Sequence, residues 1–294
     1  MKIAYMIQAH TGEKQLIKLV NVLLSDENDI FIHVDKSNDG LFSKMKNAFK
    51  NTTNVFILDE RINVNWSGLS QVNAALSLMR SIRDTSKKYN YIHYISGQDF
   101  PIKSQSEMNT FLTDHYGKEF IEYQDISDLY WRIECFNFFR ENKNNRKLYL
   151  RMIDNMIRYP QKFVVRRNNF KGMKLYYGSQ WFTITYDCML YILNYLDEDP
   201  DYLKKFHYTA CPDEHFFQII ILNSPFKENV INNNLRFIDW SLGKNSPAIL
   251  TIKDYSRLKS SQKLFARKFN LAVDDKIIEG LENDMLSNDK TLQK

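Results

Sequence analysis

Residues 3–10 read IAYMIQAH and residues 29–36 read DIFIHVDK. Each stretch begins with an apolar run of strand length and ends on polar side chains, as a buried strand followed by a loop does. Two further strand-like runs and two helical patterns complete the series, at 54–58, 91–95, 15–24 and 69–82. This alternation predicts an α/β fold with a mostly parallel sheet flanked by helices.

Polar side chains follow these strands at the ends where parallel sheets bind their ligands. They belong to the segments Gln8 to His10, His33 to Lys36, Asn65 to Ser67 and Gly97 to Asp99. Because the carboxyl ends of parallel strands lie at one edge of a sheet, we expect these loops to converge on a single ligand site.

The composition narrows the class of protein. The chain has 294 residues, 44% hydrophobic and 26% charged, which is typical of a globular protein. No GxGxxG, GxxxxGK[ST] or GxSxG motif occurs, which argues against dinucleotide oxidoreductases, P-loop NTPases and elbow-type hydrolases. The three cysteines form no CxxC pair, so neither a disulfide framework nor a structural zinc is expected. We expect one domain over 1–270, with a basic helical insertion, and a tail at 271–294.

The positive charge is concentrated in segment 143–174. It holds ten Lys and Arg against Asp154 alone, a net +9, so with +5 overall the remainder sums to −4. An apolar stripe, at 149, 152, 153, 156 and 157, predicts an amphipathic basic helix. Three interpretations stay open: a solvated helix whose stripe packs on the body, an acceptor-binding element, or a contact with an anionic membrane. Aromatic residues are not interleaved as in nucleic-acid binders, so no nucleic-acid partner is expected.

An acidic pair precedes the apolar run 216–222. Pro212 suits the first position of a helix, which would place Asp213 and Glu214 in the first turn, where the helix dipole favours a carboxylate suited to act as a base. The sequence Asp197-Glu198-Asp199 resembles a metal-binding DxD motif, but it follows an apolar helix and reads as a helix-end cap. Lys268 stands between aromatic residues, where apolar packing would fix its charge for a phosphate.

Several ordered blocks are familiar together: IAYMIQAH, FIHVDKS, VNWSGLSQVNAAL, YISGQDFPIKS, YGSQWFTIT, CPDEHFFQIIILNS, RFIDW and KLFARKF. In this order they resemble the core-2/I-branching family of glycosyltransferases, which includes the peptide O-xylosyltransferases. The resemblance implies a GT-A-like Rossmannoid fold and an inverting transferase. It also implies a UDP-sugar donor, mostly UDP-GlcNAc or UDP-xylose, and no divalent metal or other cofactor.

The resemblance also implies residue roles. Glu214 matches the family's catalytic base, and Lys268 matches the lysine that neutralises the donor pyrophosphate. The arginine that assists this lysine has no counterpart, because an ungapped count reaches Asn245, and neighbouring Lys244 is expected to substitute. The expected nucleotide-sugar contacts are Gln8, Asp35, Trp66, Gly97, Asp99, Lys244 and Lys268. The expected acceptor contacts are Trp181, Asp213 and Trp240.

The expected reaction is therefore metal-independent transfer of GlcNAc or xylose from a UDP-sugar to a hydroxyl of a glycan or lipid-linked oligosaccharide. Two alternatives stay open: a retaining transferase or glycoside hydrolase with a second carboxylate, and an inactive glycan-binding member that uses Trp181 and Trp240 as platforms. No signal peptide or membrane span is recognisable, so a cytoplasmic chain is expected, peripheral on the inner membrane face if segment 143–174 binds lipid.

Overall fold

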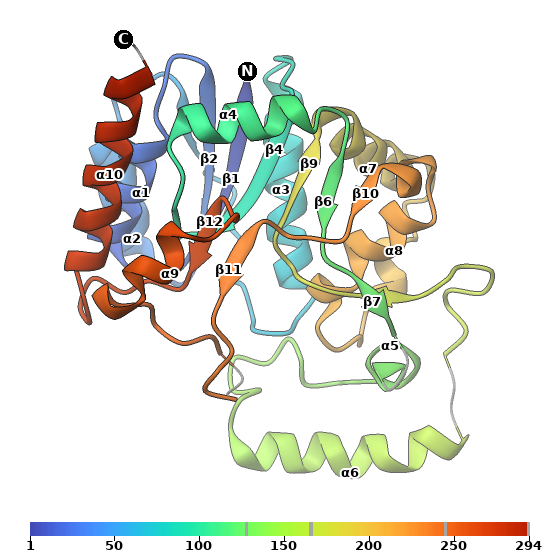
Figure 1. Cartoon of the computed structure of the whole chain (residues 1–294). Helices are drawn as coiled ribbons and strands as arrows, with labels where there is room; N and C mark the ends of the chain where they lie inside the picture. The colour runs from blue at the N-terminus through green and yellow to red at the C-terminus, as the bar shows by residue number, and fades with distance from the viewer. Residues whose placement is uncertain (127–128, 165–166, 244–245, 293–294) are drawn as a thin grey trace.

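The computed structural model describes residues 1–126, 129–164, 167–243 and 246–292. A seven-stranded sheet of order β10-β6-β9-β4-β1-β2-β3 forms its centre (Figure 1). Its strands are β1 (Ile3–Ala9), β2 (Asn28–Val34), β3 (Val55–Ile57), β4 (Tyr91–Ser96), β6 (Glu119–Ile121), β9 (Phe182–Thr185) and β10 (Val230–Ile231). Only β9 runs antiparallel to its neighbours, β4 and β6. The predicted α/β class with a mostly parallel sheet is confirmed.

Two hydrophobic cores cover the two faces of this sheet, because alternate side chains of β1 point to opposite sides. Ile3, Tyr5 and Ile7 pack with one set of helices, and Ala4 and Met6 pack with the other. The first set is α1 (Glu13–Leu23), α2 (Asp39–Ala48), α4 (Gln105–Asp114) and α10 (Lys276–Leu292). The second set is α3 (Ser70–Asp84), α7 (Tyr186–Glu198) and α8 (Phe216–Leu222).

Two small sheets were not anticipated from the sequence. One has the order β11-β12-β5, from β11 (Arg236–Ile238), β12 (Phe265–Arg267) and β5 (Asp99–Pro101). The other pairs β7 (Gln124–Asp125) with β8 (Tyr176–Tyr177). The antiparallel register of β12 on β5 sets Arg267 opposite Asp99, which brings two distant parts of the chain together. Two short helices, α5 (Trp131–Glu134) and α9 (Tyr255–Lys259), lie outside these sheets.

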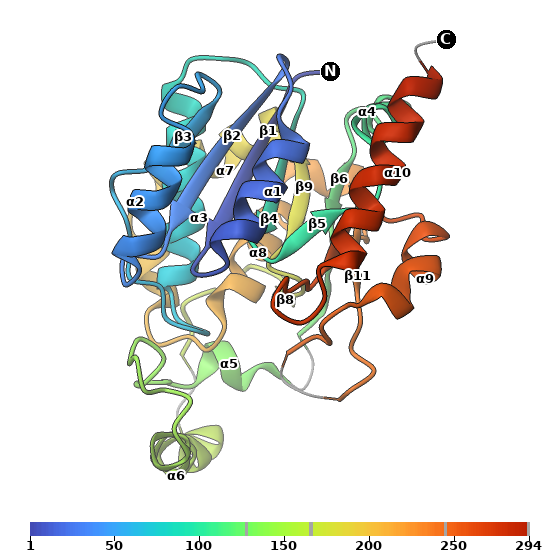
Figure 2. The same cartoon turned by 90° about the vertical axis from the view of Figure 1, so that its left-hand side faces the viewer.

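The segment expected to be a tail, 271–294, contains α10. Its residues Ile277, Ile278 and Leu281 are buried in the first core. The amphipathic character of α10 therefore serves to cover the sheet beside α1, as Figure 2 shows.

Helix α6 (Leu148–Val164) lies within the basic segment, as the sequence predicted. Both views place it apart from the rest of the ribbon, on the side of the sheet where β1 and β4 end (Figures 1 and 2). Its apolar stripe does not pack on the body: Met152, Ile153 and Met156 are exposed. Over the part of the chain that the structure describes, no helix combines the length and apolarity needed to span a bilayer.

Candidate active site

The strand order reverses between β1 and β4, and an open α/β sheet binds its ligand at such a point. Gln8 near the end of β1 lies beside Ser96 at the end of β4. The amide of Gly97 donates a 2.9 Å hydrogen bond to the Gln8 carbonyl. A side chain at Gly97 would place its Cβ 3.0 Å from the Cβ of Ala9, so the close approach of the two loops favours glycine.

Gln8 belongs to a polar network at this edge. Its Nε2 donates to Gln71 Oε1 at 2.7 Å, and the Tyr94 hydroxyl donates to its Oε1. Gln180 Nε2 donates to the Tyr94 hydroxyl at 3.1 Å. Burial raises the pKa of Tyr94, so its phenol keeps the proton that it donates. The expected donor contact Gln8 is thus held in one orientation by neighbours on α3, on β4 and in the loop before β9.

Asp35 organises the loop after β2. Its Oδ1 accepts hydrogen bonds from the Ser37 amide at 2.8 Å and the Ser37 hydroxyl at 2.5 Å, and its Oδ2 accepts one from the Val64 amide at 3.0 Å. The carboxylate therefore joins the loop after β2 to the loop that carries Trp66. A uridine that bound here would meet a carboxylate already fixed by these donors.

Asp99 is completely buried, so it faces protein and not an open surface. Its Oδ2 accepts from the Ser96 amide at 3.0 Å, and its Oδ1 lies 3.5 Å from Nε of Arg267. Burial raises the pKa of Asp99, and the charge of Arg267 opposes that rise. The Arg267 guanidinium in turn lies 4.5 Å from the ring centroid of Trp181. Asp99 thus positions Arg267, which stacks on one of the expected acceptor contacts.

Three cations act electrostatically on His10, the residue that follows β1. Partial desolvation lowers the pKa of His10, Asp35 opposes this, and Arg146, Arg267 and Lys268 lower it further. Desolvation, Arg267 and Arg146 likewise lower the pKa of Lys268. Cations whose charges act on the same side chains favour the binding of an anion there.

Lys268 donates a hydrogen bond to the hydroxyl of Ser246. This contact places Lys268 against the loop that follows β11. Lys244, the expected second phosphate contact, lies outside the described residues.

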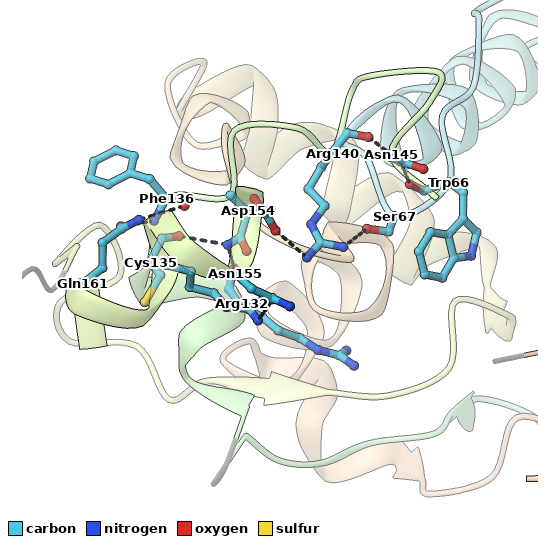
Figure 3. Close-up of polar contacts among 12 residues, drawn as sticks. Trp66, Ser67, Arg132, Cys135, Phe136, Arg140, Asn145, Asp154, Asn155 and Gln161 are labelled. Carbon is cyan, nitrogen blue, oxygen red and sulfur yellow. Dashed lines mark hydrogen bonds and ion pairs between the residues drawn. The ribbon is translucent and has the colours of Figure 1, made fainter. Parts of the chain in front are cut away.

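Arg146 was not identified from the sequence, where it was one of ten cations in segment 143–174. Its guanidinium lies 4.8 Å from the ring centroid of Trp66, and the side chain of neighbouring Asn145 donates to the Trp66 carbonyl at 2.6 Å. Figure 3 shows Asn145 and Arg140 reaching the two residues at this loop, Trp66 and Ser67. The basic segment therefore reaches the expected uracil contact.

The acidic pair has two unlike environments. Asp213 is buried, and burial together with the charge of Glu214 raises its pKa to about 8. The Glu214 carboxylate forms an ion pair with Arg132, and its side chain is 36% exposed. Arg132, on α5, is a second candidate site residue that was not identified from the sequence. Of the two carboxyl groups, only that of Glu214 is both paired with a cation and accessible.

The local backbone structure around Glu214 differs from the expected first turn of a helix. Pro212–Glu214 form a separate 3₁₀ turn, and α8 begins only at Phe216. His215 interrupts the helix with φ −126°, and its buried Nδ1 lies 2.9 Å from the Tyr176 carbonyl. The amide of Gly178 donates to the Glu214 carbonyl at 2.8 Å. These contacts of the His215 side chain and the Glu214 backbone position Glu214, in place of the expected helix dipole.

The remaining expected residues lie as follows. Trp240 is on the loop after β11 with its side chain exposed. Asp197 pairs with Arg83 and Asp199 pairs with Lys205 at the end of α7, so this acidic run caps a helix, as predicted. Within the described ranges, no three His, Cys, Asp or Glu side chains gather in a way that could hold a metal ion.

Fold and residues together define an α/β protein with a candidate ligand site at the switch point of a mostly parallel sheet. A family model described as "Branch: Core-2/I-Branching enzyme" matches residues 3–261, and the chain belongs to this family.

Among curated relatives, Xylosyltransferase 2 of Rattus norvegicus is 26% identical over 96% of this chain and 33% of its own length. Xylosyltransferase 1 of Homo sapiens is 24% identical over 98% of this chain and 31% of its own length. The chain thus spans about a third of the length of these relatives. A solved structure titled "WbbM bifunctional glycosytransferase apo structure" aligns with a TM-score of 0.34 at 10% identity, covering 78% of this chain and 38% of that one. That overlap is too loose to support an argument.

Proposed function

We propose that the protein is an inverting glycosyltransferase. It moves a sugar from a UDP-sugar to a hydroxyl of a glycan or lipid-linked acceptor by direct displacement. Membership of the Core-2/I-branching family and the names of the xylosyltransferase relatives support this class of reaction. The observation that carries the proposal is the unequal environment of Asp213 and Glu214.

Glu214 is the proposed base. Direct displacement at the anomeric carbon needs one group that takes the proton of the acceptor hydroxyl as the new bond forms. Asp213 holds its own proton at neutral pH, because its pKa is raised to about 8, so it is a poor acceptor. Glu214 forms an ion pair with Arg132 and is partly exposed, so an acceptor hydroxyl can reach it. Arg132 orients the carboxylate.

The leaving UDP needs an electrophile as its negative charge develops. We assign this role to Lys268 together with Arg146, because both act on His10 at the end of β1 and Arg146 stacks on Trp66. Arg267 adds positive charge beside them. These side chains would do the work that a divalent metal does in other transferases, so the proposed reaction needs no metal.

The proposed donor is UDP-xylose or UDP-GlcNAc. The names of the relatives make UDP-xylose the first candidate to test, and UDP-GlcNAc remains the second. The two sugars differ at the 2-acetamido group and at C6. Trp181, which the Arg267 guanidinium covers, and exposed Trp240 are the proposed platforms for the acceptor sugar.

The decisive test uses Glu214→Gln. This substitution keeps size and hydrogen bonding but removes the base, so we expect turnover to fall by about 10²–10⁴-fold, the usual contribution of a general base. Binding of UDP, measured by isothermal titration, should change little. Glu228→Gln, an exposed glutamate on the turn after α8, is the matched control. UDP release by Glu214→Gln at a near-normal rate would remove Glu214 from the role, and NMR of the product anomer separates inversion from retention.

A further inference from the structure

Helix α6 presents its polar side to the protein. Asp154 is buried and accepts from Nη2 of Arg140 at 3.2 Å. Gln161 is also buried: its Oε1 accepts from the Phe136 amide at 2.7 Å and its Nε2 donates to the Phe136 carbonyl at 3.1 Å. Figure 3 shows both contacts between α6 and the preceding loop. The helix is therefore held to the body by hydrogen bonds and an ion pair.

A third contact on the same side of α6 also involves a charged side chain, in a cation–π contact. The guanidinium of Arg158 lies 3.9 Å from the ring centroid of Trp131 on α5. Positions 154, 158 and 161 follow at intervals of four and three, so they share one face of the helix. Apart from buried Leu150, polar and charged groups thus occupy the face that meets the body, the kind of face that an amphipathic helix normally turns to water.

The opposite face is apolar and exposed. Its residues are Tyr149, Met152, Ile153, Met156, Tyr159 and Phe163. Met156 is 74% exposed and Phe163 is 76% exposed, although both belong to types usually found inside. Their three- and four-residue spacing aligns most of them along one stripe of a helix about 25 Å long. A continuous apolar stripe that faces outward marks an interaction surface for a protein or a membrane.

Cations surround this stripe. Lys143, Lys147, Arg151 and Lys171 are all exposed, and none forms an ion pair with another described residue. Segment 143–174 has a net charge of +9 in a chain of +5. An outward apolar stripe beside unpaired cations matches the two components of an anionic bilayer surface, its acyl chains and its head groups. The exposed edge-to-face pair of Tyr159 and Phe163, with centroids 5.7 Å apart, suits the interfacial layer.

We propose that α6 is a membrane-docking helix that lies in the surface of an anionic bilayer, with its apolar stripe among the acyl chains and its polar face bound to the protein. A self-associating protein interface would explain the apolar stripe but not the concentration of like charge, since two copies of a +9 segment repel each other. The carboxyl-end side of the sheet, where Trp66 and Lys268 lie, would then face the membrane side of the molecule. This placement suits a lipid-linked acceptor.

The test measures binding of the full chain to vesicles of phosphatidylcholine with or without phosphatidylglycerol, by co-sedimentation. The variant Met152→Gln/Met156→Gln/Phe163→Gln removes the stripe with a residue that keeps helix propensity. The matched control Tyr116→Gln/Ile252→Gln/Val273→Gln removes the same number of exposed apolar side chains from other elements. Far-UV circular dichroism establishes that both variants are folded.

We expect the wild type to bind vesicles with phosphatidylglycerol at least about tenfold more strongly than vesicles without it, and added salt to weaken this binding. The stripe variant should bind at least about tenfold more weakly, and the control should bind as the wild type does. Absence of wild-type binding, or equal binding by the stripe variant, would overturn the proposal. So would sedimentation velocity showing a wild-type dimer that the stripe variant dissolves, since the stripe would then be a self-association interface.

The inference goes beyond the proposed reaction and can fail separately from it. Vesicle binding needs no sugar donor, so it is measured whether or not transfer occurs. UDP release by the stripe variant without vesicles should stay within about twofold of the wild type, because no residue of the stripe is placed in the active site.

Discussion

Gly178 offers a sensitive test of how the backbone positions Glu214. It follows β8, and its amide donates the 2.8 Å hydrogen bond to the Glu214 carbonyl. A Cβ at this position would lie 1.9 Å from the carbonyl oxygen of Glu122 and 2.7 Å from its carbonyl carbon. These are backbone atoms, so they cannot swing away as the end of a side chain can. Gly178→Ala must therefore separate the two backbone segments.

Two effects should lower the free energy of unfolding of Gly178→Ala. Forcing extra atoms into a packed site costs about 1–3 kcal/mol, and losing the hydrogen bond to Glu214 costs about 0.5–1.5 kcal/mol. The free energy of unfolding should thus fall by about 1.5–4.5 kcal/mol, which lowers Tm by about 2–7 °C for a chain of this size. Because a displacement of about 1 Å can reduce catalysis 10²-fold, kcat should fall well beyond what the stability loss explains.

Gly40→Ala is the matched control. The Cβ of residue 40 would have the Asn38 Oδ1 at 3.7 Å as its nearest neighbour, and the position lies in α2. This exchange should leave activity unchanged and leave stability equal or raised by about 0.5–1 kcal/mol. Urea denaturation and UDP release measure both quantities. If Gly178→Ala were as stable and as active as the wild type, the close approach to Glu122 would not constrain the site.

Three further outcomes are expected. Asp213 binds a proton up to about pH 8 in the folded chain but only to about pH 4 in the unfolded chain, so raising the pH through this window lowers the free energy of unfolding by at most about 1.4 kcal/mol per pH unit. In urea denaturation, Asp213→Asn should lack this component of the pH dependence. If stability changed with pH in parallel for the wild type and the variant, the raised pKa of Asp213 would be contradicted. Arg146→Ala should weaken UDP binding about tenfold by titration, whereas Arg151→Ala, an exposed cation of the same segment, should not; equal effects would show only a general charge effect. Activity should survive EDTA, and loss that manganese restores would refute the metal-free proposal.

The α/β class and the mostly parallel character of the central sheet could be predicted, because long apolar strands alternate with regular helices in the first part of the chain. The sheet containing β5 and β12 could not, since strands of three residues carry too little periodicity to recognise. Arg132 and Glu214 are 82 residues apart, and nothing local to Trp131 or Arg132 signals their pairing. The spacing of apolar residues in the basic segment predicted that α6 is amphipathic. It could not predict which face of α6 meets the body, because that depends on distant partners such as Arg140 and Phe136.

Arg140 contacts both helix α6 and the loop that carries Trp66. It bonds Asp154 of α6 through Nη2 and the hydroxyl of Ser67, beside Trp66, through Nη1. One guanidinium thus connects the helix proposed to meet lipid with the ring proposed to meet the donor. Thermodynamic linkage makes any such connection reciprocal: the factor by which vesicles tighten UDP binding must equal the factor by which UDP tightens binding to vesicles. A donor-loaded enzyme would then gather at the bilayer to the same degree that the bilayer favours loading.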